Sequence, residues 1–406
     1  MKLKLEFWLR FSIINLFFVA LLGTLMRYKM GFDFPIFDLK HLLHSHSHFA
    51  FAGWISHSLM VLMIFYLTNK ISHLYLQKYT RLIILNLISA YGMLVLFIIQ
   101  GYAFGSIVFS TLSIIISYFF AYFFIKDLKK TPKSTTNNWF KGALIFYVLS
   151  SVGTFFLAYA VATDKGNYEP YQASIYFYLH FQYNGWFIFA CLGLLADFLQ
   201  LNKLENSLFN RAYKWLFLST LITYLLSILW LDIPDWAYAV TVVFAVIHLV
   251  VWCGLALLII RNKKTLLKKH PLFLQYFLVI SGICLTLKFL LQLLSAIPDL
   301  SAIVFGLHAL IIAYLHLVLL AVISIFLLYY IFANKLLSVN PISKVGLIGF
   351  VIGIFLNELI LSLQSLSILG YIFVPKTNEM LFVAALIMLL STSIIISGIY
   401  KKKALN

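Results

Sequence analysis

Long stretches that are almost free of charge recur along the whole chain, and they constrain its fold more than any other feature. A helix needs about 20 consecutive apolar residues to cross a bilayer. In lipid the backbone polar groups must be satisfied within the segment, so each stretch is predicted to be a helix. Twelve stretches qualify, at about 6–27, 41–68, 81–99, 103–125, 141–162, 172–200, 212–231, 236–260, 271–296, 301–333, 343–367 and 378–399.

The composition leads to the same class. Of the 406 residues, 63% are hydrophobic and only 11% are charged, whereas soluble domains carry about 25% charged residues. We predict an all-α polytopic membrane protein with one transmembrane domain over residues 1–406. The net charge of +17 does not indicate nucleic acid, because the lysines stand in short runs between apolar stretches. The three cysteines are far apart, so neither disulfides nor thiolate metal sites are expected.

Basic loops alternate with neutral or acidic ones. Lys and Arg are retained on the cytoplasmic side of a membrane. The loops after the second, fourth and eighth stretches are basic, as at Lys70, Lys130 and Lys264, and both ends of the chain carry lysines. Most loops after odd-numbered stretches are short, neutral or acidic. The pattern predicts twelve spans in a bacterial inner membrane, with both termini in the cytoplasm.

Histidines gather in the second stretch. Five of the eleven lie between His41 and Met60, namely His41, His44, His46, His48 and His57. Histidine is costly in hydrocarbon unless it is paired, binds a metal or lines a polar cavity. Neutral imidazole is a suitable ligand for iron, copper or zinc. The cluster therefore favours a metal centre, with haem iron as the first hypothesis.

A weak internal repeat places three histidines in corresponding helices. His48 begins HFAFAGW, His180 begins HFQYNGW and His316 begins HLVLLAV. These segments lie in the second, sixth and tenth stretches, which predicts three four-helix units at about 1–133, 134–270 and 271–406. Counted from the cytoplasmic loops, the three histidines lie within roughly two helical turns of one level. Two imidazoles at one depth can hold a planar haem from both sides.

This layout resembles subunit I of the haem-copper oxidase superfamily, which includes the nitric oxide reductases. His46-Ser47-His48 followed by Gly53 is also similar to the HxHxxxxG pattern of the NnrS family, twelve-span haem proteins linked to nitric oxide. The resemblance implies that His48 and His316 are the axial ligands of a low-spin, b-type haem. It further implies that His180 binds a second metal, copper or iron. Asn184 stands where the HxxxEG run of the nitric oxide reductases has Glu.

The chain also departs from that superfamily. The seventh stretch has no histidine, so the His-His pair of the copper site is missing, and Tyr314-Leu315-His316 replaces the helix-ten HxH. The remaining candidate metal ligands are His44, His46, His248 and His308. We expect haem-dependent redox chemistry or nitric oxide or oxygen-related respiration, fed by a cytochrome or quinol donor, and no complete proton-pumping oxidase. Whether the chain is an enzyme stays open.

Charged and aromatic residues inside the spans complete the prediction. Glu358 and Lys288 are costly at such depth, and with Asn184 they are candidates for proton relay or for hydrogen bonds to a metal ligand. Arg27 is a candidate for binding haem propionates. Trp54 and Trp186 are candidates for packing on a porphyrin.

Two transporter hypotheses remain beside the haem hypothesis. The first is a copper or zinc transporter that uses the cluster from His41 to His48. The second is another twelve-helix secondary transporter in which Glu358 and Lys288 couple the substrate to an ion. Helices broken at mid-membrane by Gly or Pro are typical of the second class, and the spans contain no internal proline, which counts against it.

Overall fold

A computed structural model describes residues 5–32, 34–163 and 168–401 of the chain, and every regular element in these ranges is a helix. Ten of these described helices are long and apolar enough to cross a membrane. The chain is therefore a multi-pass membrane protein. The terminal lysines Lys2, Lys4, Lys402 and Lys403, which support the predicted cytoplasmic termini, lie outside the described residues.

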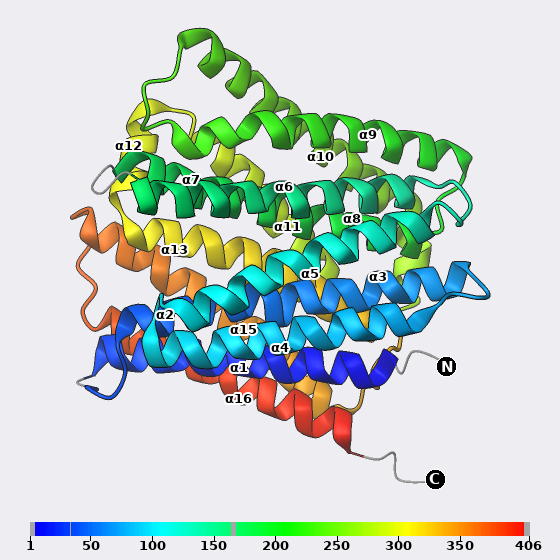
Figure 1. Ribbon diagram of the computed structural model, residues 1–406, viewed down its shortest axis with the longest axis horizontal. Coiled ribbons are helices and arrows are strands. Elements are labelled where there is room, and N and C mark those ends of the chain that lie inside the picture. The colour runs from blue at the N-terminus through cyan, green and yellow to red at the C-terminus, as the bar shows by residue number, and fades with distance from the viewer. Residues whose placement is uncertain (1–4, 33, 164–167, 402–406) are drawn as a thin grey trace. The chain divides into compact units, whose positions relative to one another are not determined.

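The chain divides into two compact units, Met1–Phe120 with Ser324–Asn406, and Ala121–Ile323. In unit 1, α1 packs against α2 and α16, α15 packs against α16, and α2 packs against α4 (Figure 1). Its helices are α1 (Leu5–Gly31), α2 (Leu39–Phe49), η1 (Ala50–Ser56), α3 (His57–Lys70), α4 (Leu76–Gln100), the first part of α5 (Phe104–Leu128), α14 (Ile325–Ala333), α15 (Pro341–Ile368) and α16 (Thr377–Tyr400).

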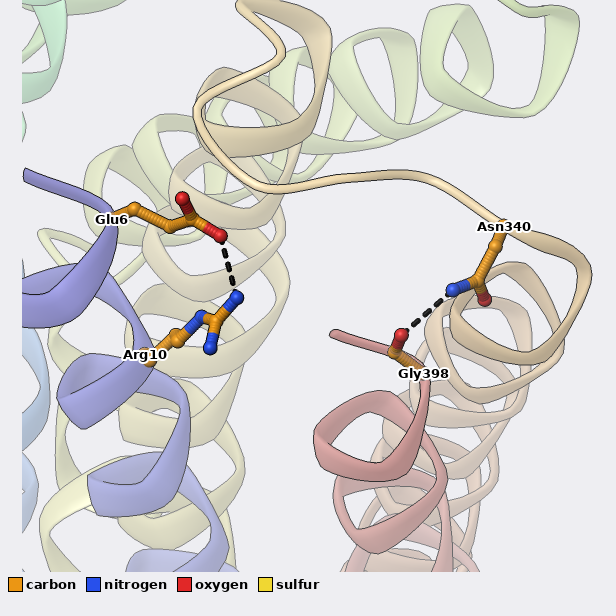
Figure 2. Close-up of polar contacts among 4 residues, drawn as sticks. All are labelled: Glu6, Arg10, Asn340 and Gly398. Atoms are coloured by element: carbon orange, nitrogen blue, oxygen red, sulfur yellow. Dashed lines mark hydrogen bonds and ion pairs between the residues drawn. The ribbon is translucent and has the colours of Figure 1, made fainter. Parts of the chain in front are cut away.

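Polar contacts at the helix ends of unit 1 explain where α15 begins and how it is joined to α16. Asn340 caps α15, because its side chain accepts a hydrogen bond from the Ser343 amide at 2.8 Å, and Pro341 occupies the first helical position. The same side chain donates to the Gly398 carbonyl of α16 at 2.7 Å, and Figure 2 shows this contact. Figure 2 also shows Arg10 paired with Glu6 one turn earlier on α1, at 2.6 Å.

In unit 2, α6 packs against α7, α8 and η2, and α10 packs against both α9 and α11. The elements of this unit are the rest of α5, α6 (Thr135–Thr163), α7 (Tyr168–His180), η2 (Phe181–Phe187), α8 (Ile188–Phe198), α9 (Lys203–Ile222), η3 (Thr223–Ile228), α10 (Asp235–Leu267), α11 (Leu272–Leu294), α12 (Pro298–Gly306), α13 (His308–His316) and η4 (Leu317–Ser324), whose last residue belongs to unit 1.

The predicted spans agree with the helices in position and differ in detail. Ten predicted stretches coincide with the ten long apolar helices. The other two, 172–200 and 212–231, are helical over most of their length but are more polar, for example at Gln182 and Asn184. The predicted span 301–333 is interrupted at Leu307, whose backbone is extended. The count of twelve spans and the three repeated units stay predictions.

Candidate functional site

Three π-helices follow the three histidines of the internal repeat. His48 stands two residues before η1, His180 directly before η2, and His316 directly before η4. A π-turn widens the helix and shifts the carbonyl partners, and such turns occur frequently at functional sites. No pattern in the sequence predicted these turns. Their common register marks the three histidines as the best starting points for a functional site.

Buried amides from neighbouring helices bind the backbone of η1. Asn15 of α1 donates to the Gly53 carbonyl at 2.6 Å, and Asn86 of α4 donates to the Ala52 carbonyl at 3.1 Å. Tyr91 in turn donates to the Asn15 oxygen at 2.7 Å. In lipid, a carbonyl that a π-turn leaves without its usual partner must find another protein donor. These asparagines therefore stabilise the widened turn.

The glycine shared by HFAFAGW and HFQYNGW has a packing role in both π-helices. A Cβ atom on Gly53 would lie 2.8 Å from Cε2 of Phe49, and a Cβ atom on Gly185 would collide with the side chain of Phe146. Real Cβ contacts are not this short, so only glycine fits without movement of an aromatic ring. In both segments of the repeat, the glycine five residues after the histidine thus leaves room for an aromatic ring against the helix backbone.

In unit 1, His44 and His48 lie on one face of α2, as their four-residue spacing predicts. The His48 ring stacks on Phe97 with centroids 4.5 Å apart, and its Nε2 lies 2.8 Å from the Tyr102 hydroxyl. The His44 ring meets the Tyr102 ring edge-on at 4.5 Å. Tyr102, which the sequence analysis did not single out, is therefore the side chain that joins these two histidines.

The other histidines of the cluster bind backbone carbonyls in different places. Nδ1 of His41 lies 3.3 Å from the Ile98 carbonyl, and Nδ1 of His46 lies 3.1 Å from the Val19 carbonyl. His57 is fully buried. Within the described ranges, no group of three His, Cys, Asp or Glu side chains is placed to hold a metal ion.

The predicted haem-contacting residues of unit 1 are buried but already have protein contacts. Trp54 lies in η1 and donates from Nε1 to the Ser324 hydroxyl at 2.8 Å. Arg27 is 8% exposed and attracts Glu358 electrostatically. Glu358 also accepts a hydrogen bond from its neighbour Asn357 at 3.2 Å. The charges of Arg27 and Glu358 thus interact in the structure, and the sequence analysis did not anticipate this interaction.

In unit 2, a chain of hydrogen bonds connects Lys288 to His180. Lys288 donates to the Asn184 side-chain oxygen, and the Asn184 amide nitrogen lies 3.1 Å from Nδ1 of His180. Nε2 of His180 lies 2.8 Å from the Thr220 carbonyl. The side chains of Lys288, Asn184 and His180 are each at most 2% exposed.

The Thr220 carbonyl and the Lys288 amine, at the two ends of this series of hydrogen bonds, decide which atoms between them donate and which accept. The Thr220 carbonyl can only accept, so Nε2 of His180 carries the proton, and Nδ1 is the acceptor. The Asn184 amide therefore donates to Nδ1, which agrees with its oxygen accepting from Lys288. Both ring nitrogens of His180 are engaged in this arrangement. The imidazole offers no lone pair to a metal here, so the residues do not fit the second metal that the resemblance implies.

Two more residues surround the Lys288 ammonium. Gln292, one turn along α11, accepts a hydrogen bond from Nζ at 2.5 Å. The Phe289 ring centroid lies 4.2 Å from Nζ, and the His248 ring of α10 lies 4.2 Å from the same Phe289 ring. The four-residue spacing of Lys288 and Gln292 is a signal that sequence analysis could have used. Phe289 carried no such signal.

The remaining predicted residues of unit 2 are placed as follows. His316 is half-buried at the end of α13. Trp186 is fully buried in η2 and stacks on Tyr147, with centroids 4.4 Å apart. Tyr314 meets Tyr183 edge-on at 6.1 Å. The side chain of His308 lies outside the described part of the chain.

Comparisons with known proteins complete the description. No family model matches the chain, and no curated protein matches it.

Proposed function

We propose that the chain is a membrane haem protein for redox chemistry or nitric oxide or oxygen handling, with His48 and His316 as the axial ligands of a b-type haem. The single observation that carries the proposal is the common position of these histidines, each within two residues of a π-helix. A haem held by two imidazoles supplies one-electron transfer. In this proposal the chain has twelve spans in three four-helix units, as in subunit I of the haem-copper oxidases.

The setting of His48 fits an axial ligand better than that of the neighbouring histidines. Within the described residues its Nε2 contacts the hydroxyl of Tyr102, a side chain that is 53% exposed. His41 and His46 are instead bonded to backbone carbonyls, which cannot turn away. Stacking on Phe97 keeps the His48 ring oriented whichever group Nε2 contacts.

The other predicted site residues would surround the haem without binding its iron. Arg27 would hold propionates by charge-assisted hydrogen bonds, and Glu358, which it attracts, would carry protons. Trp54 and Trp186 would form part of the apolar surroundings. A cytochrome or quinol would donate electrons, and nitric oxide or oxygen would be the gas ligand.

The test is an optical spectrum of the purified protein, oxidised and dithionite-reduced, with an iron analysis. The protein is made in haem-replete cells. We expect a sharp reduced α-band and stoichiometric iron. A colourless, iron-free protein would contradict the proposal and favour one of the transporter hypotheses.

Substitutions then assign the ligands. His48→Ala and His316→Ala are each expected to abolish the band, because an axial position is lost. His73→Ala is the matched control, since His73 is exposed in the loop between α3 and α4. A band that survives either ligand substitution, with its position and height unchanged, would show that the iron is held elsewhere.

A further inference from the structure

Lys288 is a buried basic residue without a buried acidic partner in the part of the chain that the structure describes. Its side chain is 0% exposed, and its hydrogen bonds go to the neutral amide oxygens of Asn184 and Gln292. Among the described residues, no carboxylate pairs with it. A charged lysine inside a membrane-spanning segment is costly unless its charge is compensated. An amide dipole compensates only part of a full charge.

The helices of unit 2 offer no acidic residue to complete the pair. The described carboxylates of this unit stand at or near helix ends, as Glu169, Asp197, Glu205, Asp235 and Asp299 do. The interior of α6, α10 and α11 contains none. Among the described residues of this unit, no carboxylate compensates Lys288, so either a bound anion supplies the charge or the amine is neutral.

A second buried basic group contacts the same phenylalanine ring. His248 is 3% exposed, and its Nδ1 has no hydrogen-bond partner within the described structure. The His248 ring centroid and Nζ of Lys288 each lie 4.2 Å from the Phe289 ring centroid, so at most 8.4 Å, the sum of the two distances, separates them. A buried polar atom without a partner costs stability. One anion next to both groups would satisfy the charge of Lys288 and the open position of His248.

We propose that Lys288 and His248 form the binding site of a small monovalent inorganic anion, with chloride as the probe. Lys288 has three N–H donors, and the two amide oxygens use two of them. The third binds the anion, and a neutral His248 with its proton on Nδ1 donates a second hydrogen bond. We expect a small anion because the residues around Nζ of Lys288, namely Asn184, Gln292 and Phe289, are all buried. It is monovalent because the site needs about one negative charge beyond these dipoles.

This site is independent of the proposed haem. It uses neither of the two proposed haem ligands, His48 and His316, and its readout needs no optical band. A protein without haem that still binds chloride would separate the two proposals, as would a haem protein that does not bind it.

The experiment measures radiolabelled chloride on the detergent-purified full chain, with gluconate replacing chloride at constant ionic strength. Thermal unfolding is followed in the same series of salts. Wild-type protein is expected to show saturable binding and an unfolding temperature that rises with the logarithm of the chloride concentration above the dissociation constant. Lys288→Met is expected to bind about 10- to 100-fold more weakly, because a hydrogen bond to a charged group is lost.

Two further variants keep the test decisive. Lys126→Met is the matched control, because Lys126 is an exposed lysine at the end of α5, and its chloride binding should equal that of the wild type. His248→Phe keeps a ring against Phe289 and should weaken binding in the same direction as Lys288→Met. Wild-type protein without saturable chloride binding would overturn the proposal, as would Lys288→Met binding equal to wild type. Either result would mean that Lys288 is a neutral amine.

Discussion

Lys288 donates a hydrogen bond to the side-chain oxygen of Asn184, although the two residues lie 104 positions apart in the chain. This contact orients the Asn184 amide so that its nitrogen faces Nδ1 of His180. The lysine on α11 and the Thr220 carbonyl thus favour the same tautomer of the imidazole on α7, with the proton on Nε2. The histidine that the resemblance assigns to a metal is, in this structure, part of a polar network around a lysine.

The first prediction concerns Asn184→Asp. This change places a carboxylate where the Lys288 ammonium already has an oxygen partner, so the pair becomes charge-balanced within the protein. We expect the stabilisation by chloride to disappear, while stability in gluconate becomes equal to or greater than that of wild type. Thermal unfolding in the two salts measures both quantities.

The matched variant is Asn184→Leu, which removes the oxygen and supplies no charge. It should lower the free energy of unfolding by about 1–3 kcal/mol, because both Lys288 and His180 lose a buried partner. If Asn184→Asp kept the chloride dependence of wild type, Lys288 would not be the group that chloride neutralises.

A second prediction concerns the amides that support η1. Asn15→Leu leaves the Gly53 carbonyl and the Tyr91 hydroxyl without their partner, and Asn86→Leu removes the donor to Ala52. Each change should lower the free energy of unfolding by about 1–3 kcal/mol. Titration with a denaturing detergent, with the helix content followed by circular dichroism, measures the loss of free energy of unfolding.

Asn69→Leu serves as the control for these two variants, because Asn69 is exposed near the end of α3. Its stability should stay within about 0.5 kcal/mol of wild type. Equal stability of all three variants would show that the π-helix does not depend on the asparagines.

A third prediction separates two glycines. Gly185→Ala puts a Cβ atom against Phe146, so the ring must move, and stability should fall by about 1–3 kcal/mol. Gly254→Ala, in the middle of α10, meets no atom within 4 Å and should be neutral or stabilising by up to about 1 kcal/mol, because alanine favours helix. Thermal unfolding of both variants beside wild type gives the comparison, and a loss of the same size in both would refute the packing role of Gly185.

A fourth prediction concerns the start of α2. Asp38 caps this helix, since its side chain accepts from the His41 amide at 3.0 Å, and this bond lowers the pKa of Asp38 below its ordinary value near 3.8. A lowered native pKa means that the stabilisation is complete above the ordinary value and is lost as the pH falls through the native one. The protection factor of the His41 amide, which is the intrinsic exchange rate divided by the observed one, should therefore fall below about pH 4. Asp38→Asn, which caps without titrating, should lack this step, and a step of the same size in the variant would contradict the assignment.

The helices were predictable because their signal is long and repetitive. Spans such as 81–99 and 343–367 contain enough apolar residues to identify a membrane helix from composition alone. The common face of His44 and His48 followed from their spacing. The interruption at Leu307 was missed although Gly306 directly before it is one of the usual signals, because the apolar run continues on both sides.

The site was less predictable because it depends on contacts between distant segments. Lys288 and Asn184 were both singled out, but nothing in the sequence shows that they meet, or that His180 completes the chain. The π-helices were missed for a related reason. A π-turn has no simple residue pattern, and the donors that satisfy it, such as Asn15, lie far away in the sequence.

The most direct test of the haem proposal is the low-temperature electron paramagnetic resonance spectrum of the oxidised protein. If His48 and His316 both bind one iron, the wild type will show a low-spin ferric signal with bis-imidazole character. His48→Met and His316→Met will each shift that signal, while His73→Met leaves it unchanged. A purely high-spin wild-type signal, or a low-spin signal that neither methionine variant moves, would contradict the assignment of these two histidines.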